Sequence, residues 1–177
     1  PDPTTRWDVA VPPIRDLDLA KLILNLPNLR RCLARGMFEN EGCALPLVLS
    51  HATKLEMLDA SRPYTVGTPG RSPQGAAHNT AQTDATARQR AYAWSGLGAC
   101  ETLRDLNIDG HRLPREAGEI LGKLCALEKL DASESTLESI AFASKLPGLS
   151  ELVLHGCPAL GAHDEACMRA LGSHPLL

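Results

Sequence analysis

One short phrase, repeated at nearly constant spacing, restricts what this chain can fold into. The phrase has the form Leu-x-x-Leu-x-apolar, and copies of it begin at Leu103, Leu127 and Leu149. Self-similarity at a period of roughly 20 to 50 residues is typical of repeat architectures, in which each unit buries its apolar side against the next. The chain is therefore predicted to form a stack of thin layers.

Two looser copies precede these three, beginning at Leu29 and Leu55. The string Leu-Asp-Ala-Ser of residues 58–61 recurs at 130–133 in the same frame, which supports a common repeat. The interval between the second and third copies is about twice the usual spacing. Within it, residues 62–86 are rich in Pro, Gly, Thr, Ala and Gln and have almost no large aliphatic side chains. We interpret this stretch as a flexible insertion within the repeats.

Each phrase predicts a short strand with one apolar and one polar side. In residues 105–109 Leu and Ile alternate with Asp, Asn and Asp, and alternate side chains of a strand point to opposite faces. Parallel strands need crossover connections, which we expect to be a helix at residues 116–124 and a turn-like segment at 137–146. The other elements expected are a degenerate strand at 7–11 and helices at 16–26, 85–97 and 164–171.

The pattern Leu-x-x-Leu-x-Leu at these spacings resembles the leucine-rich repeat family over about residues 26–177, apart from the insertion. The resemblance implies an α/β fold, a curved right-handed β-α superhelical solenoid with a parallel sheet on its concave face and short helices or turns on its convex face. Residues 1–177 would form one solenoid, with 1–28 as N-terminal lead-in and cap. The family usually places Asn or Cys three residues after the last leucine. This chain has Cys157 there, and Pro63, His111 and Ser135 in other copies.

The sequence is expected to be a fragment of a longer chain. It begins with Pro1, without an initiator Met or a signal-peptide pattern, and residues 173–177 resemble the approach to another repeat. No apolar run is long enough for a membrane span. The cysteines lack zinc-site spacing, and we interpret Cys32, Cys125 and Cys157 as small buried hydrophobic residues. We expect a cytoplasmic, reducing location, with organelle targeting left open.

Composition and motifs argue against several functions. A net charge of -3 and a pI near 6.1 disfavour a general nucleic-acid or anionic-membrane surface. No nucleophile, phosphate-binding or metalloprotease motif is present, and the six histidines are scattered. Asp105 and Asp131 would lie on adjacent strands, but an open sheet offers no pocket to perturb their pKa values. We therefore expect no enzyme, cofactor or metal; the alternative is an enzyme that uses the insertion as a lid.

In leucine-rich repeat proteins the usual binding surface is the outward row of the strands, so the resemblance places the partner site there. The candidate residues are Arg31, Arg35, Met57, Asp59, Asp105, Asn107, Asp109, Lys129, Asp131, Glu151, Val153 and His155. Acidic groups on neighbouring strands repel one another, and a basic ligand would relieve this repulsion. We expect a non-catalytic scaffold or adaptor that binds a protein partner, through a basic segment, within a larger intracellular assembly. The alternative is a substrate-recognition or GTPase-regulator subunit.

The insertion offers a second candidate site. Thr68 and Ser72 each precede a proline, with Arg71 between them, so both are candidates for proline-directed phosphorylation. Long loops inside compact domains are generally either functional or disordered. Plain disorder is the alternative interpretation.

Overall fold

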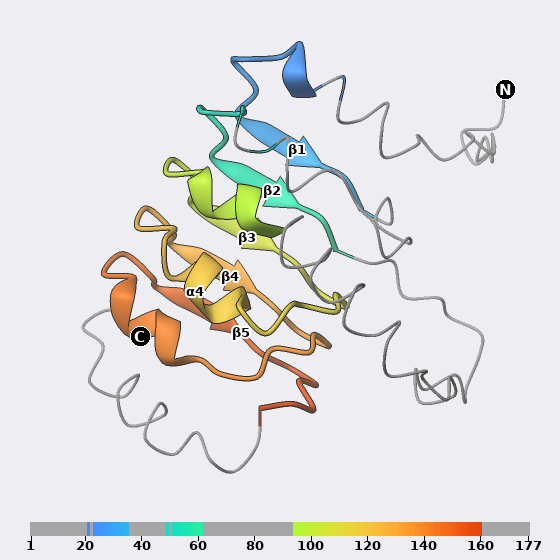
Figure 1. Cartoon of the computed structure of the whole chain (residues 1–177), viewed down its shortest axis with the longest axis vertical. Coiled ribbons are helices and arrows are strands. Elements are labelled where there is room, and N and C mark those ends of the chain that lie inside the picture. Colours follow the sequence, from blue (N-terminus) through green and yellow to red (C-terminus); the bar gives the residue numbers. More distant parts are fainter. Residues whose placement is uncertain (1–20, 22, 36–48, 50, 62–93, 161–177) are drawn as a thin grey trace, which may run out of the picture.

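Five short strands form one parallel sheet in the computed structural model, which describes residues 21, 23–35, 49, 51–61 and 94–160. The strands are β1 (Arg31–Leu33), β2 (Met57–Asp59), β3 (Asp105–Asn107), β4 (Lys129–Asp131) and β5 (Glu151–Val153). They are hydrogen-bonded in sequence order, and every neighbouring pair is parallel. Figure 1 shows the five arrows side by side, all pointing the same way. The predicted α/β class with a parallel sheet is confirmed.

The strands are aligned in the frame that the repeated phrase predicts. The second residue of each strand faces the interior and pairs in register with its neighbours; these residues are Cys32, Leu58, Leu106, Leu130 and Leu152. The first four are buried, and Leu152, in the last strand, is partly buried against the core. The backbone ladder continues past the strands, because the amide N–H of Ile108 donates to the carbonyl oxygen of Asp131, and that of Ala132 to Val153. One phrase therefore corresponds to one layer of the sheet.

A tight turn precedes every strand and is built in the same way each time. The N–H of Leu127 donates to the carbonyl oxygen of Leu124, whose own N–H donates to Leu121. The same pair of bonds recurs before each of the other four strands. Apolar residues three apart face inward before β4, where Leu121, Leu124 and Leu127 are all buried. The layer of β1 is looser, since Ile23 is buried but Leu26 is 39% exposed. The interior is filled mainly by leucine in register, with a single large ring, Phe142, among its buried described members.

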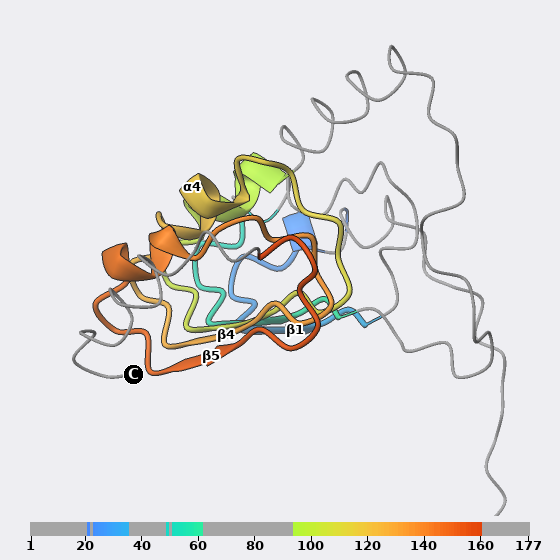
Figure 2. The same cartoon turned by 90° about the horizontal axis from the view of Figure 1, so that it is seen from below.

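Short helices lie opposite the sheet. They are η1 (Gly96–Ala99), α4 (Ala117–Leu121) and η2 (Ala141–Lys145). Figure 2 shows them in a layer of their own, across the interior from the strands. A helix is thus confirmed within the expected range 116–124, although it ends at Leu121, and the turn-like connector expected at 137–146 contains η2. None of the described helices has the length and apolar composition needed to cross a membrane.

The structure corrects the interpretation of two cysteines. Cys32 is buried as predicted, but Cys125 is exposed and Cys157 is only partly buried. Cys125 lies in the turn between Leu124 and Leu127. Because inward positions in that turn are three residues apart, the residue directly after an inward leucine faces solvent.

Several predictions fall wholly or partly outside the described residues. The strand at 7–11, the insertion at 62–86 with Thr68 and Ser72, and the helix at 164–171 lie entirely outside them. The same holds for residues 1–20 of the lead-in and 85–93 of the third helix. Within the described part, residues 21, 23 and 24 and residues 94 and 95 are helical, as predicted.

Candidate functional site: the outer face of the sheet

On one side of the sheet the side chains point away from the helices, and we call this side the outer face. It consists of the first and third residues of each strand and the residue two positions further on. These are Arg31, Leu33, Arg35, Met57, Asp59, Ser61, Asp105, Asn107, Asp109, Lys129, Asp131, Ser133, Glu151, Val153 and His155. The register places the candidate partner-binding residues that lie in the strands on this one side of the sheet. The other candidates, Arg35, Asp109 and His155, lie two residues after β1, β3 and β5. The outer face is therefore the candidate binding site.

The middle of the outer face has a structural function that the sequence did not reveal. Asp59, Asn107 and Asp131 lie side by side in register. Each accepts, through Oδ1, the backbone N–H of the residue two positions later, at 3.2, 3.0 and 3.0 Å. This local bond fixes the turn at the end of the strand. On β5 the corresponding residue is Val153, which has no acceptor, and the N–H of His155 instead donates to Ser133 Oγ at 3.2 Å.

Asp59 is not the exposed carboxylate that alternation predicted. Its relative exposure is 3%, and Arg35 Nε donates to its Oδ2 at 2.5 Å. Burial acts to raise the pKa of Asp59, but hydrogen bonds from Ser61 and Arg35 and the charge of Arg35 outweigh it, so the pKa lies below its ordinary value. The chain itself therefore neutralises this carboxylate, and the predicted exposure of Asp59 is wrong.

The first position of each strand carries charges that are partly paired across strands. Lys129 Nζ lies 2.7 Å from Glu151 Oε2, and this hydrogen bond, followed by the charge of Glu151, raises the pKa of Lys129. Arg31 Nε donates to the sulfur of Met57 at 3.2 Å. Asp105 lies next to Lys129 in register and forms no ion pair within the described residues. This position is thus basic at β1, acidic at β3 and internally paired at β4 and β5.

Asp109, just after β3, is a carboxylate whose surroundings disfavour its ionised form. Its pKa is raised, first by burial and then by the negative charges of Asp131 and Glu134. Its Oδ1 is buried and accepts no hydrogen bond from any described residue. Neither Asp109 nor Asp131 forms an ion pair with a described cation. Asp105 acts on the neighbouring Lys129 through its charge but makes no ion pair with it, so three carboxylates at β3 and β4 form no ion pair within the described part of the chain.

The turns after β3, β4 and β5 each contain one residue with a left-handed backbone conformation, at the same position relative to the strand. Gly110, Glu134 and Gly156 have φ values of 75°, 51° and 68°, and each lies three residues after its strand. The N–H of Gly110 donates to the carbonyl oxygen of Ser133, and that of Glu134 to His155. His155 Nε2 lies 3.9 Å from Glu134 Oε1. The turns thus stack in the same way as the strands.

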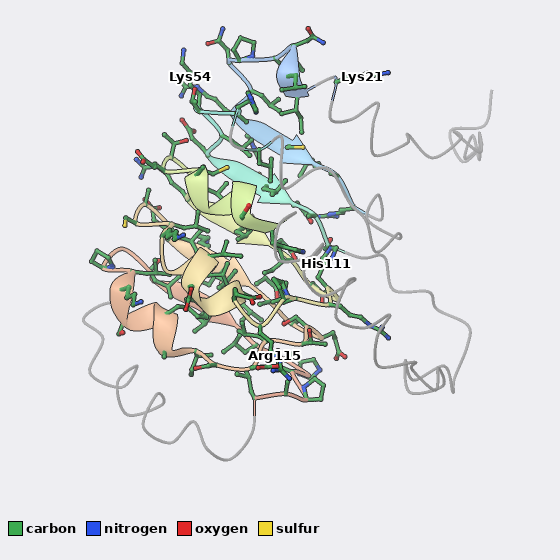
Figure 3. The ribbon with its side chains drawn as sticks, viewed as in Figure 1. Lys21, Lys54, His111 and Arg115 are labelled. Atoms are coloured by element: carbon green, nitrogen blue, oxygen red, sulfur yellow. The ribbon has the colours of Figure 1, made fainter. Side chains whose placement is uncertain are left out.

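Two side chains, each three residues after the last apolar residue of its repeated phrase, bond to the backbone of the preceding layer. His111 is buried, and its Nε2 lies 2.7 Å from the carbonyl oxygen of Ala60, so this nitrogen carries the proton and donates it. Its ring meets Trp94 edge-on, with centroids 5.8 Å apart. Cys157 Sγ donates to the carbonyl oxygen of Ala132 at 3.1 Å. Figure 3 shows His111 past the arrowheads of the strands, and Lys54 at their opposite ends.

The described residues show no arrangement that points to catalysis or to a metal. No group of three or more His, Cys, Asp or Glu in the described ranges is placed to hold a metal ion. Burial raises the pKa of Cys32, and raises that of Cys100 to about 11, so both thiols are kept in their unreactive protonated form.

No protein-family model matches the sequence, and no curated protein matches it significantly.

Proposed function

We propose that this chain is a leucine-rich repeat solenoid that acts as a non-catalytic protein-binding module, through the outer face. The solenoid interpretation is supported by turns, strands and left-handed positions that repeat in register from layer to layer. It is also supported by His111 and Cys157, which bond the turning backbone of the preceding layer where the family usually has Asn or Cys. In such a solenoid the outer face is the concave one.

The observation that carries the binding proposal is the surplus of negative charge on β3 and β4. Asp105, Asp109 and Asp131 form no ion pair with a described cation, and Asp109 is held in a site that disfavours its ionised form. A Lys or Arg side chain from a partner would relieve this repulsion between the carboxylates. The partner is therefore a protein with an exposed basic segment, bound as part of a larger intracellular assembly.

The test is affinity capture with matched neutralising substitutions. The binding variant is Asp105→Asn/Asp131→Asn, in which the amide oxygen at position 131 can still accept the Ser133 N–H, as Asn107 does on β3. The control is Glu116→Gln/Glu119→Gln, which makes the same change in charge at α4 in the opposite layer. We expect wild type and control to recover the same partner, identified by mass spectrometry, and the binding variant to lose it. Equal recovery by all three proteins would refute binding through the outer face.

A further inference from the structure

Exposed apolar side chains lie at both ends of the outer face. Leu33 on β1 is 65% exposed and Val153 on β5 is 38% exposed, which makes them two of the four exposed large hydrophobic residues in the described part. Both occupy the same register position as Asp59, Asn107 and Asp131. A line drawn across the five strands of Figure 1, from β1 to β5, is thus apolar, then polar and acidic, then apolar.

The length of this line fits an extended peptide. Neighbouring strands are about 4.8 Å apart, so the four intervals between β1 and β5 span about 19 Å. An extended chain rises about 3.3 Å per residue and alternates its side chains, so residues i and i+6 point the same way about 20 Å apart. Residues i+2 and i+4 of such a peptide would then lie over the middle strands.

The middle of the line selects for positive charge. Arg35 already pairs with Asp59, so the carboxylates without an ion pair are those at β3 and β4. There Asp109 and Asp131 are close enough for their negative charges to repel each other. Asp105 adds a third carboxylate on the other side of Asn107. Two basic side chains, at i+2 and i+4, would meet this charge.

We propose that the outer face recognises an extended segment of the pattern apolar-x-basic-x-basic-x-apolar, in which the two apolar residues contact Leu33 and Val153 and the two basic residues contact the carboxylates of β3 and β4. This inference rests on the proposed function of the same face and adds the spacing that a partner must have. The x residues of the peptide point to solvent, so any residue type can occupy these positions.

The direct test is peptide binding by fluorescence anisotropy. The parent peptide has the sequence Leu-Ser-Lys-Ser-Lys-Ser-Leu with a fluorophore on a flexible linker. A charge control replaces both lysines by glutamate, and a spacing control moves the last leucine by one residue, to the opposite side of the extended chain. A hexa-arginine peptide reports charge-driven binding without any pattern.

We expect the parent peptide to bind, the glutamate peptide not to bind, and the spacing control to bind about 5-fold more weakly, because one apolar contact is lost. The protein variant Leu33→Ser/Val153→Ser should weaken the parent peptide about 10-fold or more. Leu24→Ser, which changes an exposed leucine elsewhere in the molecule, should leave its affinity unchanged.

The outcomes separate the two proposals. If hexa-arginine binds but the parent peptide does not, or if neither the spacing control nor Leu33→Ser/Val153→Ser weakens binding, the pattern is overturned and the basic-segment function stands. If no basic peptide binds, both proposals fail.

Discussion

At the scale of single residues, the structure divides the polar side chains of the outer face into two groups. Asp59, Asn107 and Asp131 all accept the backbone N–H that closes their own turn, although alternation marked them only as outward-facing. Asp59 is in addition buried and paired. Asp131, like Asp105 and Asp109, forms no ion pair within the described residues. The sequence could identify the surface, but it could not show which carboxylates remain free to bind, since that depends on contacts across strands.

The two carboxylates with shifted pKa values should respond to pH in opposite directions. The folded state binds the proton of Asp109 more tightly than the unfolded chain does, so ionisation of Asp109 destabilises the fold as pH rises above the ordinary value of about 3.9. Asp109→Asn should therefore raise the free energy of unfolding at pH 7, as measured by urea denaturation. Lower stability of this variant at pH 7 would contradict the electrostatic assignment.

Asp59 provides the matched comparison. Its lowered pKa contributes stability above about pH 3.9 that is lost as pH falls through the lower folded value. Asp59→Asn should lower the free energy of unfolding at pH 7, and its difference from wild type should shrink in acid. A pH-independent difference would show that Asp59 acts through packing alone.

His111 should contribute to stability through its hydrogen bond to the carbonyl oxygen of Ala60. His111→Ala removes the donor to the Ala60 carbonyl and the edge contact with Trp94. Leaving a buried acceptor unsatisfied costs about 1 to 3 kcal/mol, and we expect a loss in that range by urea denaturation. His155→Ala is the control, because the His155 side chain is 84% exposed, and should change stability by less than about 0.5 kcal/mol. Equal effects of the two variants would exclude this function of His111.

At the scale of elements, a strand of three residues is stable only through its neighbours. Leu106 on β3 has strands on both sides and is fully buried, whereas Leu152 on β5 pairs with β4 alone among the described strands and is only partly buried. Leu106→Ala should cost about 2 to 5 kcal/mol of unfolding free energy, and Leu152→Ala less, in chemical denaturation. A larger loss for Leu152 would contradict the observed stacking order.

The turns after the strands depend on their left-handed position. Gly156 has a φ of 68°, and an added Cβ would lie 2.1 Å from Glu134 Oε1. Gly156→Ala should therefore destabilise the fold by about 1 to 2 kcal/mol, measured by thermal unfolding. Gly148→Ala is the control, because its Cβ would meet only the Leu127 carbonyl oxygen at 3.5 Å, without a left-handed φ. If Gly148→Ala were as harmful as Gly156→Ala, the turn geometry would not be the cause.

The turns also show where sequence reasoning reaches its limit. Periodicity identified all five strands and their frame, because apolar spacing directly reports which side chains face the core. The left-handed position after the strand was missed, since Glu134 interrupts the glycines at 110 and 156. The bond from His111 to Ala60 was missed too, because it joins residues on either side of the insertion.

At the scale of the whole molecule, the stacking of repeats places equivalent residues of successive strands side by side on one surface. Each layer is in register with the next, so a residue type that recurs in the phrase becomes a row across the sheet. Charges before the strands are paired along such a row, with Arg30 bonded to Glu56 and Arg104 to Glu128. The outer face differs because its acidic residues on β3 and β4 are not matched in this way. That contrast is the basis for assigning binding to this face.

The most direct test of the binding assignment is NMR mapping of a hexa-arginine peptide on the intact protein. We predict that amide shifts change at residues 105–109 and 129–134, at the carboxylates of the outer face, and that Asp109→Asn/Asp131→Asn abolishes these changes. Shifts confined to α4 and η2, or unchanged in that variant, would contradict the account.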